Sequence, residues 1–274
     1  MKVIKSTEEI KLIKFESPFA FVPTMGNLHQ GHLSLVKYGI DNFSEVITSI
    51  FINPLQFGKN EDFSNYPKTL SQDVELLEKL GCNYLFLPEP NFAKNLDTII
   101  PRFSDVLCGL SRPTHFQGVI TIINKFLNVL KPNACLLGLK DYQQQLIIKD
   151  YVKRKKIKTD IISLPIVREA SGLAMSSRNN YLSQEDRKHC GKIFSCLQDL
   201  ARSSSISSFD SLKSSAIEYL TQADFKIDYL EFVDADDLSP ATETTKKLLI
   251  AIAVIFKKVR LIDNILVLVQ PELS

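Results

Sequence analysis

The sequence predicts an α/β protein with a Rossmann-like, doubly wound parallel sheet and a smaller C-terminal α+β lid domain. Short apolar runs alternate with segments of helical length over the first two thirds of the chain, as is typical of βαβ units. From about residue 179 the order changes to two helices followed by strands. We therefore expect a first domain at residues 1–174 and a lid domain at residues 175–274. The predicted strands of the first domain lie at residues 19–22, 45–52, 83–87, 134–137 and 159–163.

The composition is that of an ordinary globular protein. Of the 274 residues, 45% are hydrophobic and 23% are charged, and the length suits one large domain plus a smaller one. The formal net charge of +2 gives no general case for nucleic-acid binding. No apolar stretch approaches the ~20 residues that a bilayer span needs. We therefore expect neither a nucleic-acid partner nor a membrane association.

The cysteines and the N-terminus indicate a cytoplasmic protein. The five cysteines are odd in number and scattered, without a Cys-x-x-Cys motif, which favours reduced thiols over a disulfide framework or a zinc site. The first residues, Met-Lys-Val-Ile-Lys-Ser-Thr-Glu-Glu, lack the apolar core of a signal peptide.

The most informative stretch covers residues 19–36. A buried strand at residues 19–22 is closed by Pro23, a loop carrying Gly26 follows, and helical spacing starts at about Leu28. A strand, a loop and a helix start form a ready phosphate site, because free N–H groups and the positive dipole end point at the ligand. His29 and His32 are three residues apart and so share one face of the first helical turn.

Alternatives remain for this stretch when its parts are taken alone. A His-x-x-His pair is commonly just a surface pair of histidines. The same spacing is also compatible with two ligands of a metal site, although no third ligand follows with metal-type spacing. The metal-ligating side chains therefore remain unknown from the sequence.

Two amides follow the second predicted strand. Asn53 and Gln56 lie directly after the run at residues 45–52, and loops at the carboxyl ends of parallel strands are where ligands bind. We expect both side chains to orient a polar substrate, although Asn-Pro is also common in turns. A helix over residues 70–80 ends at Gly81.

Arg112 and His115 precede a helix that runs to about Leu130. They are consistent with a phosphate clamp or with a simple helix cap, and the second interpretation is favoured for the segment alone. Three of the four histidines nevertheless lie in segments selected on other grounds.

Lys140 follows the strand at residues 134–137, where an ammonium can reach a phosphate oxygen. Asp141 is a plausible N-cap of the next helix, and Gln144 lies three residues further on. A routine strand–turn–helix with an ordinary cap is the alternative. The basic run at residues 153–158 is interpreted as the solvated end of that helix rather than as a nucleic-acid patch.

A third stretch, at residues 166–183, combines Gly172 with Ser176, Ser177 and Arg178, and its hydroxyls and forked cation suit triphosphate oxygens. Ser183 is a good helix start, although a serine-rich turn before a helix is common. Helices are expected at about residues 184–202 and 209–222, joined by a flexible linker at 203–209, with strands at 227–233 and 248–256.

Several ordered strings resemble a known family. Residues 23–32, Pro-Thr-Met-Gly-Asn-Leu-His-Gln-Gly-His, resemble the His-x-Gly-His signature of the nucleotidyltransferase superfamily, and the longer string is similar to the pantoate–β-alanine ligase family within it. Further similar strings are Phe-Ile-Asn-Pro-Leu-Gln-Phe-Gly from residue 51, Arg-Pro-Thr-His-Phe-Gln-Gly-Val-Ile-Thr from 112, Lys-Asp-Tyr-Gln-Gln from 140, Leu-Ala-Met-Ser-Ser-Arg-Asn from 173 and Tyr-Leu-Glu-Phe-Val-Asp-Ala from 229.

The resemblance implies a magnesium-dependent homodimer that uses ATP to join pantoate to β-alanine through a pantoyl adenylate. It implies that His32 donates a proton, with His29 and Lys140 beside the reacting phosphate, and that Gln56 and Gln144 hold pantoate, with Gln56 also meeting β-alanine. The ATP-binding residues that it implies are Met25, Gly26, Asn27, Leu28, His29, Gln30, Gly31, His32, Gly138, Leu139, Lys140, Asp141, Val167, Met175, Ser176, Ser177 and Arg178.

Three positions depart from the family pattern. Leu139, Ser171 and Thr114 stand where family members commonly carry Glu, Asp and Gly. Leu139 removes a side-chain carboxylate but leaves its amide for phosphate, and Ser171 weakens a charge-based role for that loop. The rival interpretations are another adenylyl or cytidylyl transferase, an aminoacyl-tRNA synthetase and a non-catalytic nucleotide sensor.

Overall fold

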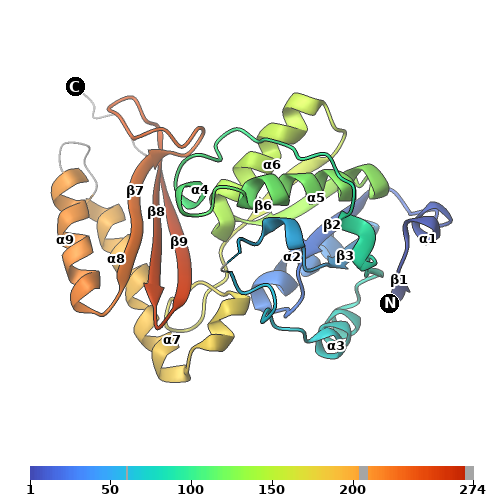
Figure 1. Ribbon diagram of the computed structural model, residues 1–274, viewed down its shortest axis with the longest axis horizontal. Helices are drawn as coiled ribbons and strands as arrows, with labels where there is room; N and C mark the ends of the chain where they lie inside the picture. The colour runs from blue at the N-terminus through green and yellow to red at the C-terminus, as the bar shows by residue number, and fades with distance from the viewer. Residues whose placement is uncertain (60, 204–208, 269–274) are drawn as a thin grey trace. The chain divides into compact units, whose positions relative to one another are not determined.

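The computed structural model describes residues 1–59, 61–203 and 209–268. The chain forms two compact units (Figure 1). The first contains residues 1–105, 112–139 and 144–166, and the second contains residues 106–111, 140–143 and 167–274. The predicted lid function of the C-terminal part, with a boundary at residues 174 and 175, stays a prediction.

A six-stranded parallel sheet forms the centre of the first unit, which confirms the predicted fold class. All its strand pairs are parallel. In spatial order the strands are β1 (Lys2–Ile4), β4 (Tyr84–Phe86), β3 (Glu45–Ile50), β2 (Phe19–Thr24), β5 (Ala134–Gly138) and β6 (Asp160–Leu164). Strand β1 was not predicted. Pro23, predicted to close a strand, lies inside β2.

Helices cover both faces of this sheet, with α2 and α3 on one side and α5 and α6 on the other (Figure 1). This arrangement follows from right-handed crossovers that wind in opposite directions from the middle of the sheet. The helices are α1 (Thr7–Lys11), α2 (Gln30–Asn42), α3 (Leu70–Leu80), α5 (His115–Leu130) and α6 (Tyr142–Lys155), with 3₁₀ turns η1 (Pro54–Gln56), η2 (Pro90–Ala93) and η3 (Leu139–Asp141).

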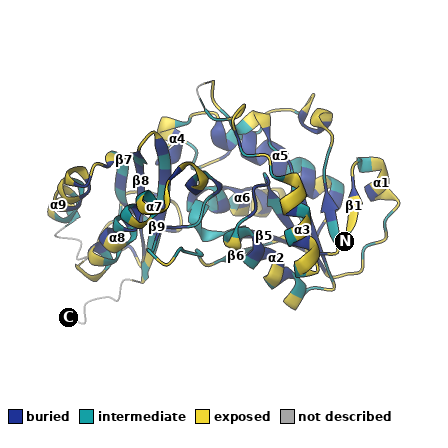
Figure 2. Cartoon of the chain, turned by 90° about the horizontal axis from the view of Figure 1, so that it is seen from below, coloured by how far each residue is buried: buried dark blue, intermediate teal, exposed yellow. Residues whose placement is uncertain are grey.

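The alternation of side chains along β2 builds the two halves of the core. Ala20 and Val22 face the cluster that contains Leu77 of α3. Phe21 points to the other face, where its ring lies 5.2 Å from that of Phe126 of α5. Burial of each large apolar side chain contributes about 1.5–3 kcal/mol. The inner strands β2, β3, β4 and β5 are mostly buried, whereas the edge strands β1 and β6 are largely half-buried or exposed (Figure 2).

The second unit is an α+β arrangement around the antiparallel sheet β7-β8-β9, as the fold class predicted. Its elements are α4 (Cys108–Ser111), η4 (Ser177–Tyr181), α7 (Gln184–Cys190), α8 (Lys192–Ser203), α9 (Phe209–Gln222), β7 (Lys226–Asp234), β8 (Lys247–Phe256) and β9 (Val259–Leu268). Apolar side chains of α8 and α9, including Leu197 and Leu220, pack against the strands in one cluster.

Some predicted boundaries in the second unit are wrong. The helix expected at residues 184–202 is two helices separated at Gly191, where a Cβ atom would lie 2.1 Å from the carbonyl oxygen of Ser171. Neither α4 nor β9 was predicted as an element. Of the expected linker at residues 203–209, residues 204–208 lie outside the described part.

The basic run ends α6, since Lys153, Arg154 and Lys155 form its exposed last turn. Arg154 pairs with Asp150 one turn earlier at 2.7 Å. The position agrees with a solvated helix end. Among the described residues, none of the helices combines the length and apolarity needed to cross a bilayer.

Helix α5 approaches the loop after β3 backbone to backbone at Gly118. A Cβ atom there would lie 2.0 Å from the carbonyl oxygen of Leu55 and 2.2 Å from its carbon. The Nδ2 group of Asn53 donates to the Gly118 carbonyl at 3.1 Å, which closes the contact. Glycine is required here by space, because a backbone neighbour cannot move aside as a side chain can.

We expect Gly118→Ala to destabilise the protein by at least about 1–3 kcal/mol, since the new methyl group overlaps the Leu55 carbonyl. Alanine in a helix is otherwise favoured over glycine by about 1 kcal/mol, so the steric effect would reverse the usual sign. Urea unfolding measures the change. Gly138→Ala is the control, because nothing lies within 4 Å of its added Cβ. Equal or greater stability of Gly118→Ala would contradict the close contact.

Candidate functional site

Two predicted binding segments follow adjacent strands at the point where the sheet reverses its order. Strand β2 is bounded by β3 on one side and by β5 on the other, and the chain leaves β2 and β5 towards opposite faces. In such sheets ligands bind outside the carboxyl ends of the strands at this switch point. The loop Met25–Leu28 follows β2, and Gly138 ends β5.

His29 and His32 lie together at the start of α2. His29 is the N-cap residue, and its Nδ1 accepts the N–H of Gly31 at 3.1 Å. The two imidazole rings have centroids 4.1 Å apart and are tilted by 32°, which confirms that they share one face. Because Nδ1 accepts, a neutral His29 carries its proton on Nε2 and can donate there to a ligand oxygen.

The carboxylate of Asp73 determines the shape of the loop between β2 and α2. It is 2% exposed and accepts the N–H groups of Asn27 at 2.9 Å and Leu28 at 2.8 Å. The loop needs this support because Gly26 and Asn27 have φ values of +81° and +50°. The expectation that the free amides of this loop face a ligand is therefore wrong for these two.

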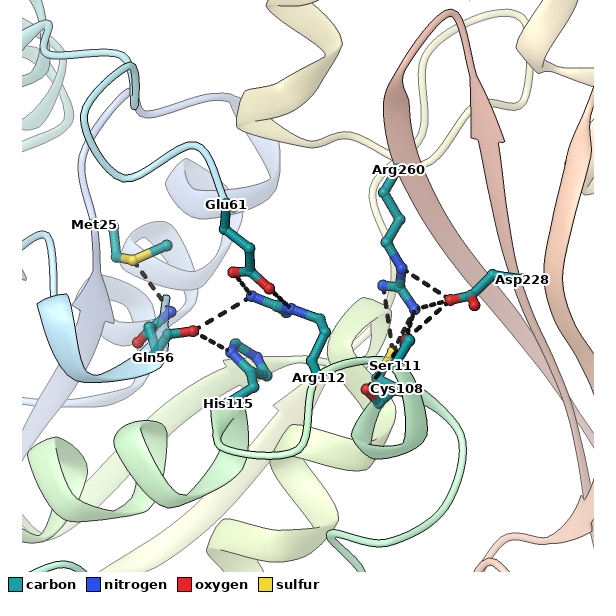
Figure 3. Close-up of polar contacts among 9 residues, drawn as sticks. All are labelled: Met25, Gln56, Glu61, Cys108, Ser111, Arg112, His115, Asp228 and Arg260. Carbon is teal, nitrogen blue, oxygen red and sulfur yellow. Dashed lines mark hydrogen bonds and ion pairs between the residues drawn. The ribbon is translucent and has the colours of Figure 1, made fainter. Parts of the chain in front are cut away.

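Gln56 lies in η1, and its side chain is held by two neighbours, of which Met25 is drawn in Figure 3. Its Nε2 donates to the sulfur of Met25 at 3.2 Å, and its Oε1 accepts from Nδ2 of Asn53 at 3.0 Å. Asn53 is 1% exposed and also accepts the N–H of Leu55 at 3.2 Å. Asn53 thus orients Gln56 directly, and its predicted contact with a substrate stays a prediction.

Arg112 and His115 hold the backbone of Gln56 (Figure 3). His115 Nδ1 lies 2.9 Å from the Gln56 carbonyl oxygen, which only accepts, so that nitrogen donates. Arg112 forms two 2.6 Å contacts with the carboxylate of Glu61 and a longer one of 3.5 Å with the same carbonyl. The favoured cap interpretation is wrong, because the N-cap position of α5 belongs to Thr114.

The Glu61–Arg112 pair is partly buried, and opposing effects act on the carboxyl group. Burial raises the pKa of Glu61, but the hydrogen bonds and charge of Arg112 outweigh it, so that the pKa lies below 4.5. The carboxylate form is therefore the one that the folded state stabilises.

Lys140 belongs to the second unit, together with Asp141. Its Nζ lies 3.4 Å from Oδ1 of Asp141, and its backbone carbonyl accepts from Nδ2 of Asn264 at 3.0 Å. Asp141 is the last residue of η3 and directly precedes α6, and its predicted N-cap role stays a prediction. Since His29 and His32 lie in the first unit, their convergence with Lys140 stays a prediction.

The serine-rich segment also lies in the second unit. Ser176 caps η4 by accepting the N–H of Arg178 at 3.3 Å, and Ser177 is buried. Met175 donates its N–H to the carbonyl of Val167 at 3.0 Å, which brings these two predicted ATP-binding residues together. Between them the chain turns at Gly172, whose φ is +92°.

Gln144 is half-buried in α6, between two glutamines that are buried and bonded to the protein. Gln143 donates to the Val106 carbonyl at 2.7 Å, and Gln145 accepts from Ser163 at 2.8 Å. The sequence prediction selected Gln144 from these three neighbours, and its contact with a substrate stays a prediction.

Sequence reasoning missed Glu61, and it also missed the structural role of Asp73. A signal existed for Asp73, since it lies four residues before Leu77 and so on the buried face of α3. A carboxylate on an apolar helix face needs partners, which would have indicated a structural role. No comparable pattern marks Glu61, which lies in an irregular loop.

Comparison with known proteins identifies the family. Residues 2–266 match the family model described as pantoate-beta-alanine ligase. This chain belongs to the pantoate–β-alanine ligase family. It is 41% identical to the pantothenate synthetase of Fervidobacterium nodosum over 97% of this chain and 99% of the relative. It is 44% identical to that of Shewanella amazonensis over 90% of both chains.

Solved structures agree with this membership. The pantothenate synthetase of Thermus thermophilus superposes with a TM-score of 0.90 at 32% identity, covering 97% of this chain and 99% of that one. The Francisella tularensis pantoate–β-alanine ligase, complexed with β-γ ATP and β-alanine, gives a TM-score of 0.80 at 34% identity over 97% of both chains.

We expect Asp73→Asn to destabilise the protein by about 1–3 kcal/mol, because an amide offers one acceptor where the carboxylate serves two backbone N–H groups. Urea unfolding gives the difference. Glu75→Gln on the same helix is the matched control, since its pair with Lys79 is exposed to solvent and contributes little to stability. Equal losses in both variants would contradict the special role of Asp73.

The contribution of Glu61 to stability should depend on pH. A lowered folded-state pKa stabilises the protein above the ordinary value of 4.5, and this contribution is lost as the pH falls through the folded value. The stability difference between the native chain and Glu61→Gln should therefore be constant near neutral pH and shrink in acid. Urea midpoints from pH 7 to pH 3 measure it, and a difference that does not change with pH would refute the ion-pair account.

Proposed function

We propose that this chain condenses pantoate with β-alanine to form pantothenate, through a pantoyl adenylate, and releases AMP and pyrophosphate. The observation that carries the proposal is the His29–His32 pair, which begins α2 at the switch point of the sheet in a chain of this family. The complex of the Francisella tularensis relative with β-γ ATP and β-alanine supports the proposal that this chain binds ATP and β-alanine.

ATP is proposed to bind to backbone and side-chain groups of both units. The first-unit residues are Met25 to His32, Gly138 and Leu139, and the second-unit residues are Lys140, Asp141, Val167 and Met175 to Arg178. The half-buried position of Ser176 and Arg178 supports their role, because hydroxyl and guanidinium groups at partial exposure remain able to meet phosphate oxygens. Leu139 contributes only backbone atoms.

In the first step the pantoate carboxylate attacks the α-phosphorus of ATP, and pyrophosphate leaves. Negative charge grows on the α-phosphate oxygens and on the oxygen of the leaving group. His29 donates from Nε2, His32 donates a proton, and the Lys140 ammonium adds a positive charge. Fixed donors and charges of this kind supply most of the rate gain in phosphate chemistry.

Pantoate is proposed to lie against Gln56 and Gln144, with Asn53 fixing the orientation of Gln56. Neutral amides orient the nucleophilic carboxylate without neutralising its charge. The contacts of Gln56 with Met25 and Asn53 support this role, because they hold its amide in one orientation before any substrate arrives.

In the second step the amine of β-alanine attacks the carbonyl carbon of the adenylate, the amide bond forms, and AMP leaves with the bond electrons. Gln56 is proposed to meet β-alanine as well. Water must be kept out at this stage, because it would hydrolyse the acyl adenylate.

Mg²⁺ is proposed to enter with ATP, bound mainly to its phosphates, as is usual for this ion. Within the described ranges, no group of three or more His, Cys, Asp or Glu side chains could hold a metal. The Asp73 oxygens already accept two backbone N–H groups and the Thr69 hydroxyl. These side chains do not fit a metal cage, and we derive no step through the ion.

The chain is further proposed to act as a cytoplasmic homodimer without a nucleic-acid or membrane partner. All five cysteines are free in the structure, which supports a reducing compartment. Sedimentation equilibrium would test the dimer.

We expect His32→Ala and Lys140→Ala each to slow adenylate formation by a factor of about 10²–10⁴, the range for removal of a proton donor or a fixed charge. AMP release from ATP, pantoate and β-alanine measures turnover, and circular dichroism checks the fold. Lys79→Ala, at an exposed lysine of α3, is the control. Near-normal turnover in both variants would refute the residue assignment.

A further inference from the structure

The turn at residues 140–143 is held by the C-terminal sheet and its neighbours. Nδ2 of Asn264 donates to the Lys140 carbonyl at 3.0 Å, and the Tyr142 hydroxyl donates to the Ala235 carbonyl at 3.0 Å. The side chain of Gln143 bonds Val106 and Cys108. The position of Lys140 therefore depends on the second unit, although the turn directly follows β5 of the first.

Asn264 is buried in a strand and its backbone is hydrogen-bonded. It is 6% exposed and lies in β9, paired with Ala251 of β8. Its N–H lies 2.7 Å from Oδ1 of Asp263. The backbone that carries Asn264 is thus fixed both by the sheet and by a neighbouring carboxylate.

Asp263 is in turn fixed by Arg168. The guanidinium makes two contacts with the carboxylate, at 2.6 and 2.9 Å, and one with the Gly172 carbonyl at 3.0 Å. It also lies 3.6 Å from the centre of the Phe194 ring. Burial raises the pKa of Asp263 and outweighs the opposing effect of Arg168.

We propose that Asn264 is a positioning residue for Lys140, fixed in place through the Asp263–Arg168 pair. The inference rests on the proposed function, in which Lys140 meets the triphosphate. A lysine side chain is a flexible four-carbon stem with little preference for one rotamer. The place that its ammonium group can reach therefore depends on where the backbone of the lysine is held. A misplacement of about 1 Å at a catalytic group can cost about 10²-fold in rate.

The same pair also fixes the segment that leads to Ser176. Arg168 and Ala174 form an antiparallel bridge, and Glu169 donates to the Leu173 carbonyl at 2.8 Å, which makes a small hairpin. Asn179 then ties η4 back to Glu169 at 2.8 Å. Two consecutive residues of β9 therefore anchor both second-unit segments that are proposed to contact phosphate.

A double-mutant cycle in the full-length chain tests the proposal. Pantoate-dependent exchange of labelled pyrophosphate into ATP reports adenylate formation without β-alanine. We expect Asn264→Ala to lower the maximal exchange rate about 10- to 100-fold, with a smaller change in the KM for pantoate, whose proposed contacts do not include Lys140. In the Lys140→Ala background the same substitution should have almost no further effect, because the group that it positions is gone.

Controls separate positioning from general damage. Ser214→Ala removes another side-chain bond to a backbone carbonyl in this unit and should leave exchange unchanged. If Asn264→Ala unfolds, Asn264→Asp, which lacks the donor but keeps the size, replaces it in the cycle. A native chain without exchange would overturn the proposed function, and this inference with it. An active native chain in which Asn264→Ala has no effect, or the same effect in both backgrounds, would overturn this inference alone.

Discussion

The pairing of β2 with β5 is the constraint on which the rest of the first unit depends. These parallel strands are joined through Ala20–Ala134 and Phe21–Cys135, and the chain winds away from them in opposite directions. Because each crossover is right-handed, the helices after the two strands cover different faces of the sheet. The loops that precede those helices are consequently left at one edge without a covering crossover, and this is where the family signature falls.

Buried polar contacts then give these loops a definite shape. Asp73 holds the loop after β2, and Asn53 and His115 hold the loop after β3. In each case a side chain satisfies backbone or amide groups that would otherwise lose hydrogen bonds on burial. The loops therefore lose their conformational entropy when the chain folds rather than when a ligand binds, and a site of this kind is called preorganised.

The sequence predicted those features that periodicity and local chemistry determine. The helix expected at about residues 70–80 with Gly81 at its end is confirmed as Leu70–Leu80, because the apolar spacing and the left-handed terminator agree. The shared face of His29 and His32 followed from helical geometry in the same way.

Features that depend on distant partners were not predicted. Arg112 was assigned to a phosphate or a cap, and it pairs with Glu61, fifty-one positions away in the chain. At the break between α7 and α8, Gly191 lies close to the backbone of Ser171, a distant contact that no local pattern encodes. Likewise, Asn264 and Lys140 are 124 positions apart in the chain, and β9, which carries Asn264, was not among the predicted strands.

The five buried thiols have a chemical consequence. Burial raises the pKa of Cys135 to about 12 and that of Cys196 to about 11, so the nucleophilic thiolate is scarce at neutral pH. These two thiols should therefore react slowly with alkylating reagents as long as the protein stays folded. Cys135 lies in the first unit and Cys196 in the second. The rate at which each thiol is labelled therefore measures the local unfolding of the unit that contains it.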